Sequence, residues 1–180
     1  MKPAIAVLAL LSFGTAQAAL VDRGGGLIYD TVLDITWLQD ANYSKTSGYH
    51  ADGSMLWNEA MVWAEDLSYY DSVRGVWLDD WRLPTTLQPD PSCDSHYMYA
   101  AGFPLQDGGY RCSGSEMGHL FTVDGVRSNS FGGYPFPSPS PFFNMDEAYY
   151  WSATDLPGDT RFAHVFEFIE GGQYRMEKYY

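Results

Sequence analysis

Apolar residues recur at helical spacing in one long segment of the chain. Residues 57–69 carry apolar side chains at positions i, i+3, i+4 and i+7, which is the spacing that gives an α-helix one buried face. Ser54 is the expected N-cap of this helix. A shorter helix is predicted at residues 115–121, with Glu116 in its first turn, where a carboxylate suits the helix dipole. The core face of the longer helix consists of Ala60, Trp63, Ala64 and Leu67.

Alternating side chains predict strands in the C-terminal part of the chain. In residues 162–169 both the odd and the even positions are largely apolar, so this strand is expected to lie inside a sheet with both faces covered. Gly171 and Gly172 then turn the chain into a last strand at residues 173–179. Further strands are expected at residues 26–30, 35–38 and 149–153.

Segments rich in Gly, Pro, Ser and Tyr separate these elements and predict surface loops. The longest, residues 86–114, follows Pro84, which ends an extended run because it fixes its own φ and restricts its predecessor. Residues 42–53 and 131–143 are the other expected loops. Because no long linker interrupts the chain, residues 19–180 are predicted to form a single domain.

The N-terminal residues 1–18 have the features of a signal peptide. One lysine precedes an apolar run at residues 4–13, which is too short to span a bilayer, and residues 16–18 read Ala-Gln-Ala, an A-x-A cleavage site. The sequence holds no second apolar stretch of membrane-spanning length. The mature chain is therefore expected to be secreted or otherwise extracytoplasmic, without a transmembrane segment.

The charge of the chain disfavours nucleic acid as a partner. Removal of Lys2 with the leader takes Lys+Arg from 10 to 9 against 23 Asp+Glu, and the net charge from −13 to −14. Phosphates would repel such a chain, and its arginines are scattered singly, without a basic stripe. The acidity is typical of a soluble exported protein, although loop carboxylates also suit calcium.

Cys93 and Cys112 are the two cysteines of the chain. Both follow the leader, so in an oxidising compartment they are predicted to form a disulfide. The bond would close a loop of about twenty residues and add about 3 kcal/mol of stability through the entropy of the unfolded chain. It would also order the long segment at residues 86–114.

Tryptophan-containing motifs lie on both sides of residues 86–114. They are Trp81-Arg82-Leu83-Pro84-Thr85, Tyr149-Tyr150-Trp151-Ser152-Ala153-Thr154 and, nearer the N-terminus, Gly26-Leu27-Ile28-Tyr29-Asp30 and Thr36-Trp37-Leu38-Gln39-Asp40-Ala41. With these motifs the chain resembles the Lcl C-terminal domain family, secreted bacterial domains related to the C-type-lectin-like fold. The resemblance extends to Gly171-Gly172, and residues 86–114 are an insertion relative to the shortest family pattern. Family members usually continue beyond the last expected strand, so this chain is expected to be a shortened or divergent copy.

The resemblance implies an α+β fold, with two helices packed on a small, irregular, mainly antiparallel sheet with long loops. Trp81 to Pro84, Trp151 and Ser152 would then be structural motif residues. Arg82 is expected to pair with a nearby carboxylate, either Asp80 or Glu116. The expected core consists of Trp63, Leu67, Trp81, Leu83, Trp151, Phe166 and Phe168.

Aromatic residues without an evident core partner occur in the expected loops, where binding residues concentrate. An adhesin is the best-understood kind of member in the family, so the resemblance implies a non-catalytic binding module for an extracellular glycan, matrix component or protein. A structural envelope protein that associates with itself is the alternative. The expected ligand-binding residues are Trp77, Tyr97, Tyr99, Tyr110, Phe131, Tyr134 and Phe136.

Three aspartates are candidate calcium ligands, namely Asp30, Asp34 and Asp90. Residues 88–90 spell Gln-Pro-Asp, a tripeptide that calcium-dependent C-type lectins use. Residues 151–153, in the strand that would follow it, lack the Asn-Asp pair of those lectins, so the tripeptide is interpreted as a chance match. No EF-hand pattern occurs. We therefore expect no cofactor, although calcium stays open.

Catalytic signatures are absent from the sequence. Its histidines show no H-E-x-x-H spacing, and no G-x-S-x-G occurs. His119 stands three residues after Glu116, which is typical of a helix-surface pair or a buried histidine. Formylglycine-generating enzymes share the broad fold, but Cys93 and Cys112 lie in an insertion that does not match their site. The chain is therefore predicted not to be an enzyme.

Overall fold

The computed structural model of the protein describes most of the chain. The described residues are 20–98, 104–131, 134–135, 140–156 and 158–179, with the backbone alone at 96–98, 104–107, 130–131 and 134–135. The expected signal peptide lies outside this part of the chain. None of the described helices is long and apolar enough to cross a membrane.

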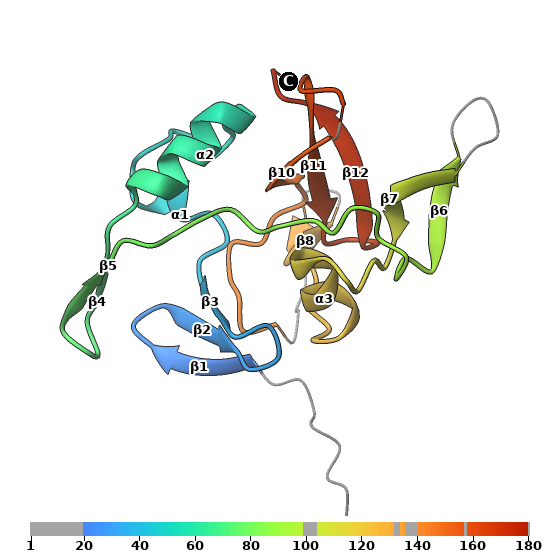
Figure 1. Ribbon diagram of the computed structural model, residues 1–180. Helices are drawn as coiled ribbons and strands as arrows, with labels where there is room; N and C mark the ends of the chain where they lie inside the picture. The colour runs from blue at the N-terminus through green and yellow to red at the C-terminus, as the bar shows by residue number, and fades with distance from the viewer. Residues whose placement is uncertain (1–19, 99–103, 132–133, 136–139, 157, 180) are drawn as a thin grey trace, which may run out of the picture.

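Helices and small antiparallel sheets are both present in the described residues, which confirms the predicted α+β class (Figure 1). The helices are α1 (Tyr43–Thr46), α2 (Trp57–Asp66) and α3 (Glu116–Thr122). The strands are β1 (Leu20–Gly24), β2 (Leu27–Asp30), β3 (Ile35–Leu38), β4 (Tyr69–Asp71), β5 (Val76–Leu78), β6 (Ser95–Met98), β7 (Pro104–Tyr110), β8 (Ser130–Phe131), β9 (Tyr134–Pro135), β10 (Tyr150–Asp155), β11 (Phe162–Glu167) and β12 (Gly172–Glu177).

The main sheet has five strands in the order β10-β11-β12-β7-β6. β11 pairs antiparallel with β10 on one side and with β12 on the other. Five of its six residues, Ala163 to Glu167, are buried. The inner strand predicted at residues 162–169 is therefore confirmed, and its apolar character on both faces follows from this position.

The insertion at residues 86–114 contributes two strands that the sequence did not predict. β6 and β7 form a hairpin, and β7 joins the sheet through the pairs Tyr110–Gly172 and Gly109–Gln173. Cys93 and Cys112, 19 residues apart, form the predicted disulfide at the base of this hairpin. The hairpin extends the main sheet on the side away from α2 (Figure 1).

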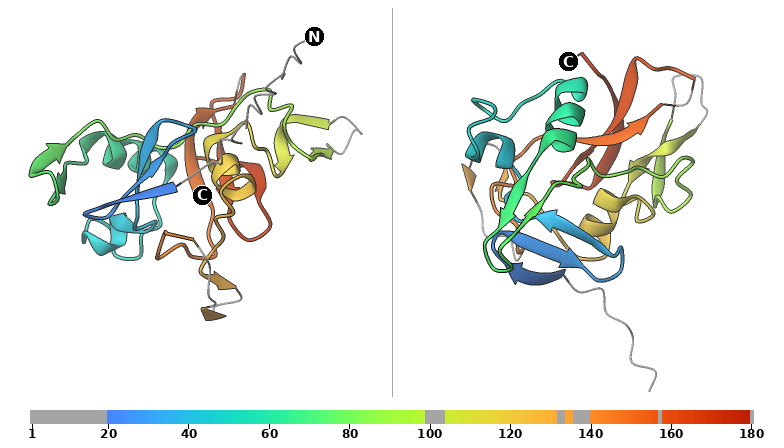
Figure 2. Two further views of the ribbon diagram at one scale, coloured as in Figure 1. Left: turned by 90° about the horizontal axis from the view of Figure 1, so that it is seen from below. Right: turned by 60° about the vertical axis from the view of Figure 1, so that its left-hand side comes forward.

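A second sheet, of order β1-β2-β3, lies at the end of the molecule below the main sheet in the right-hand view of Figure 2. The expected hairpin of residues 26–30 and 35–38 is present as β2 and β3, with Leu27 paired to Leu38 and Asp30 to Ile35. β1 was not predicted, since three of its five residues are exposed and give no apolar alternation. The chain between β5 and β6 crosses from one side of the molecule to the other without regular structure (Figure 1).

Helix α2 begins at Trp57, as expected, but its N-cap differs from the prediction. Leu56 occupies that position, and its backbone N–H donates to Oε2 of Glu59 at 3.0 Å. Glu59 thus provides half of a capping box, so the predicted cap Ser54 is not needed. The helix ends at Asp66, three residues early, because Leu67 is extended (φ −69°, ψ 121°).

The hydrophobic core lies between the main sheet, α3 and the chain just before β10. Phe166 and Phe168 are buried in it as predicted, whereas Trp63, Leu67, Trp81, Leu83 and Trp151 are only half-buried. Four of them, all but Leu67, line a cleft, and a large apolar side chain suits a cleft wall as well as a core. Leu67 lies just beyond the end of α2. The core residues are Ile28, Met117, Leu120, Phe121, Val126, Phe142, Met145, Phe166 and Phe168.

Arg82 forms the predicted ion pair, and Glu116 is its partner. Its guanidinium donates to both carboxylate oxygens of Glu116, at 2.8 and 2.7 Å, and the Thr85 N–H adds a third bond at 2.7 Å. The strand expected around Arg82 is absent, so this clamp holds the irregular segment against α3. Burial acts to raise the pKa of Glu116, but the Arg82 and Thr85 donors outweigh it and lower that pKa below its ordinary value.

Replacing Glu116 with glutamine should lower the free energy of unfolding at pH 7 by about 1–2 kcal/mol, because charge-assisted bonds at a half-exposed site are lost. Because the folded-state pKa of Glu116 is lowered, the ion pair contributes its full stability at pH values above the unfolded-state pKa. This contribution is lost as the pH falls through the folded-state pKa. Urea unfolding at pH 7 and near pH 3 measures the difference, which should shrink at the lower pH. An equal effect at both pH values would contradict the charge-based account. Glu65→Gln, at an exposed position in α2, is the control for charge alone.

Candidate functional site

A cleft of about 620 Å³ opens between the α2 region and the main sheet. Segments distant in sequence line it: β3 and the chain after it, α2, residues 81–84, α3 and the start of β10. Met117, Leu120, Phe142 and Phe168 also belong to the core, so the core forms the base of the cleft. Besides Phe142 and Phe168, its aromatic lining residues are Trp37, Tyr43, Trp63, Trp81, Tyr149, Tyr150 and Trp151.

The orientation of two cleft tryptophans is fixed by backbone acceptors. Trp81 Nε1 donates to the carbonyl of Leu78 at 3.1 Å, and Trp151 Nε1 donates to that of Met55 at 2.9 Å. An indole whose polar edge is held in this way keeps its apolar faces for packing. Trp151 thereby also joins β10 to the segment before α2, across the cleft.

Tyr69, the first residue of β4, supports the cleft wall from behind. Its ring lies edge-on to Tyr43 and Trp81, with centroids 5.2 and 5.9 Å apart. Its hydroxyl donates to the Gly25 carbonyl at 2.7 Å, and burial raises the pKa of this phenol. The position of Trp81 in the cleft wall therefore depends on how the β4–β5 hairpin is attached to the rest of the domain.

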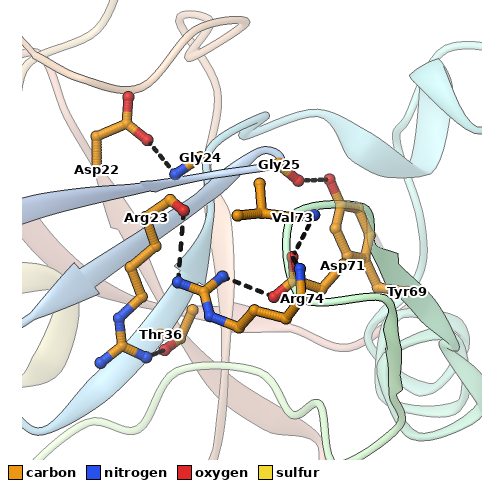
Figure 3. Close-up of polar contacts among 9 residues, drawn as sticks. All are labelled: Asp22, Arg23, Gly24, Gly25, Thr36, Tyr69, Asp71, Val73 and Arg74. Atoms are coloured by element: carbon orange, nitrogen blue, oxygen red, sulfur yellow. Dashed lines mark hydrogen bonds and ion pairs between the residues drawn. The ribbon is translucent and has the colours of Figure 1, made fainter.

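Asp71 makes this attachment, as Figure 3 shows. Its side chain is buried and accepts hydrogen bonds from the backbone N–H groups of Val73 (3.0 Å) and Arg74 (3.1 Å), and from the Arg74 guanidinium (2.7 Å). Arg74 also donates to the Arg23 carbonyl in β1, at 3.4 Å. The Arg74 hydrogen bond is the main reason why the pKa of Asp71 is lowered. The Asp71 carboxylate thus closes the hairpin turn and holds Arg74, and Arg74 makes the contact with β1.

A few polar groups also line the cleft. Asp40 accepts from the Asn42 N–H at 3.0 Å and from the Asn144 side-chain amide at 2.9 Å. The Tyr150 hydroxyl donates to the Asp146 carbonyl at 3.4 Å, and burial raises the pKa of Tyr150. Apolar walls with a few polar groups among them are typical of small-ligand sites.

Few of the ligand-binding residues predicted from sequence can be placed. Trp77 in β5 is 66% exposed and packs on Tyr70, with ring centroids 5.1 Å apart, on the protruding β4–β5 hairpin (Figure 2, left). It does not line the cleft. Tyr110, in β7, is half-buried. The side chains of Tyr97, Tyr99, Phe131, Tyr134 and Phe136 lie outside the described part of the structure.

The motif residues Trp81 to Pro84 and Trp151 line the cleft instead of filling the core. Sequence reasoning missed this role because it assigned conspicuous tryptophans to packing. The six tryptophans were an available signal, because tryptophan is large and rarely fully buried. Ser152, the remaining motif residue, is buried and accepts from the Thr86 hydroxyl at 2.9 Å.

The three candidate calcium ligands are not brought together. Asp30 is buried at the end of β2, and Asp34 (φ 55°) accepts the Tyr29 hydroxyl at 2.5 Å. Asp90 is buried and accepts the Ser115 hydroxyl at 2.5 Å. The possible metal-holding groups found among the described residues never combine two of these three aspartates.

Comparison with known proteins gives no match: no family model matches the chain, and neither does any curated protein or any solved structure. The resemblance to the Lcl C-terminal domain family therefore stays a prediction that depends on the sequence motifs.

Proposed function

We propose that this domain is a non-catalytic, extracytoplasmic module that binds a neutral glycan in its aromatic cleft. The main support for this proposal is that one cleft is lined by four half-buried tryptophans, Trp37, Trp63, Trp81 and Trp151. Indole faces suit the apolar C–H face of a pyranose ring, and the polar lining groups suit its hydroxyls.

The electrostatics favour an uncharged ligand. Asp40, Asp52 and Asp146 contribute carboxylates to the cleft lining, against the single cation Arg82, which is already paired with Glu116. Ionised carboxylates accept hydrogen bonds from sugar hydroxyls but repel sulfates and uronic acids. Neutral sugars are therefore preferred to sulfated ones.

The expected compartment agrees with this function. A predicted leader precedes the domain, and the structure contains the Cys93–Cys112 disulfide, a bond that persists in oxidising compartments. The C-type-lectin-like fold implied by the motifs is also part of this proposal, because it suits a binding cleft formed largely by loops and strand ends.

Trp63→Ala should weaken glycan binding about tenfold, because one stacking contact with a sugar ring is lost. Trp77→Ala is the matched control, since Trp77 lies outside the cleft. A glycan array with the purified oxidised protein would identify a ligand, and calorimetry would then compare the two variants. Loss of binding in Trp77→Ala alone would move the site to the β4–β5 hairpin and overturn the cleft proposal.

Self-association is the second candidate function, and one surface favours it. Tyr70, Val73, Val76 and Trp77 are all more than two-fifths exposed on the β4–β5 hairpin, at 49, 61, 44 and 66%. Exposed apolar patches of this kind mark interaction surfaces. A concentration-dependent mass in light scattering, lost in Trp77→Ser, would support self-association, particularly if the glycan array shows no ligand.

A further inference from the structure

Three ionisable side chains meet in the interior, away from the aromatic cleft. Asp30 ends strand β2, His119 lies in α3, and Asp124 follows the C-terminal end of that helix. One ligand atom from each residue lies within 4.8 Å of the other two. Asp30 is fully buried, and the side chains of His119 and Asp124 are 9% and 2% exposed.

The atoms that face one another have no hydrogen-bond partner among the described residues. This is true of Asp30 Oδ2, of His119 Nε2 and of both carboxylate oxygens of Asp124. His119 Nε2 and Asp124 Oδ2 are 3.6 Å apart, which is within ion-pair distance for a protonated histidine but beyond hydrogen-bonding distance. Buried polar atoms without partners are strongly unfavourable, and buried charges more so. A cation shared by these atoms would explain the arrangement.

We infer that Asp30, His119 and Asp124 form a structural site for a divalent transition-metal cation, with Zn²⁺ the best match. Two carboxylates and one neutral imidazole together balance the charge of such an ion. An imidazole ligand favours zinc and its neighbours, whereas calcium and magnesium prefer oxygen. In a tetrahedral zinc site with bonds of about 2.0–2.1 Å, ligand atoms lie about 3.3 Å apart, close to the separation of 3.6 Å between His119 and Asp124. The three residues provide three of the four ligands, and a water molecule would be the fourth.

The backbone holds the ligands in place. The other oxygen of Asp30, Oδ1, accepts the N–H groups of Val32 and Leu33, each at 2.9 Å, which fixes the carboxylate within its own turn. The His119 carbonyl accepts the N–H of Asp124 at 3.3 Å, so the helix end positions the third ligand. Hydrogen bonds that orient a ligand from behind are a regular feature of metal sites.

Burial gives the site a structural role. Burial and the nearby Asp30 raise the pKa of Asp124, with burial the larger cause, whereas His119 lowers it. Without a cation, two carboxylates lie close together in a dry interior, which destabilises the folded chain. A bound ion would reverse this effect and join the β2–β3 hairpin to α3.

The test combines metal binding with stability. The purified oxidised protein is treated with a chelator, and its thermal melting is followed with Zn²⁺, Ca²⁺ or neither, while calorimetry gives the stoichiometry. We expect one Zn²⁺ per chain and a rise in Tm of about 5–10 °C at about 100-fold excess over Kd. Calcium should produce a much smaller shift.

Asp124→Asn distinguishes a ligand from a residue that only packs. It should abolish the Zn²⁺-dependent rise, yet its metal-free Tm should equal or exceed that of the metal-free parent, because an uncompensated charge is removed. Asp79→Asn, at an exposed position, should leave the zinc response unchanged. Zinc binding that persists in Asp124→Asn would overturn the site. If the parent protein shows no response to zinc, the site is also overturned. Asp30 and Asp124 would then be interpreted as a carboxylate pair that shares a proton.

Discussion

Replacing Phe166 with alanine is expected to lower the free energy of unfolding by about 3–5 kcal/mol, the usual loss for a buried phenylalanine. Phe166 is 1% exposed in the inner strand β11. Its ring lies edge-on to Phe121 of α3 and Phe168, with centroids 6.0 and 4.9 Å apart. The alanine variant therefore leaves a cavity where the sheet meets the helix, and Tm should fall by about 10 °C.

Phe143→Ala is the matched control for this change, because the Phe143 side chain is 47% exposed. Its effect should stay below about 1 kcal/mol, as for most surface substitutions. Urea unfolding of both variants gives the comparison. Equal losses would mean that the core is not centred on β11.

Loss of the Cys93–Cys112 disulfide is expected to have the second-largest effect, about 3 kcal/mol. The bond closes a loop with a sequence separation of 19, so its removal restores conformational freedom to the unfolded chain. It also holds the base of the β6–β7 hairpin, which joins the main sheet through the two residue pairs with β12. Reduction should therefore release the hairpin before the rest of the domain unfolds.

Hydrogen exchange tests this order. After mild reduction, the amides of β7 should lose protection while those of β11 keep it. The double variant Cys93→Ala with Cys112→Ala should behave like the reduced protein, which excludes effects of the reductant. Unchanged protection in β7 would show that strand pairing alone holds the hairpin.

Local patterns predicted the elements whose side chains alternate or recur within a single segment. β11 and α2 were found because the apolar spacing of each is complete within one segment. β7 was missed because it is stabilised by pairing with β12, more than sixty residues away in sequence, and because a proline and two glycines hide its pattern. β6 was missed with it, since β6 pairs with β7. The early end of α2 likewise reflects the extended backbone at Leu67.

The candidate sites were less predictable, for the same physical reason. Whether an indole fills a core or lines a cleft depends on what lies opposite, and the partners of Trp81 and Trp151 come from other parts of the chain. The sequence indicated Asp30 as a metal ligand, but the predicted metal was calcium and the predicted co-ligands were Asp34 and Asp90. Its neighbours His119 and Asp124 are 89 and 94 residues away, so no local spacing could indicate the group.

The cleft and the main sheet both depend on the C-terminal strand of the domain, β12. β12 lies between β11 and β7, and the Lys178 carbonyl accepts the backbone N–H of Trp57 at 3.2 Å, where α2 begins. Contacts that close such long loops form late. A nascent chain that reaches only β10 therefore lacks the strand that joins β11 to the β6–β7 hairpin. The domain is expected to fold only once β12 has been synthesised, and a chain interrupted before Gly172 should be a substrate for proteases.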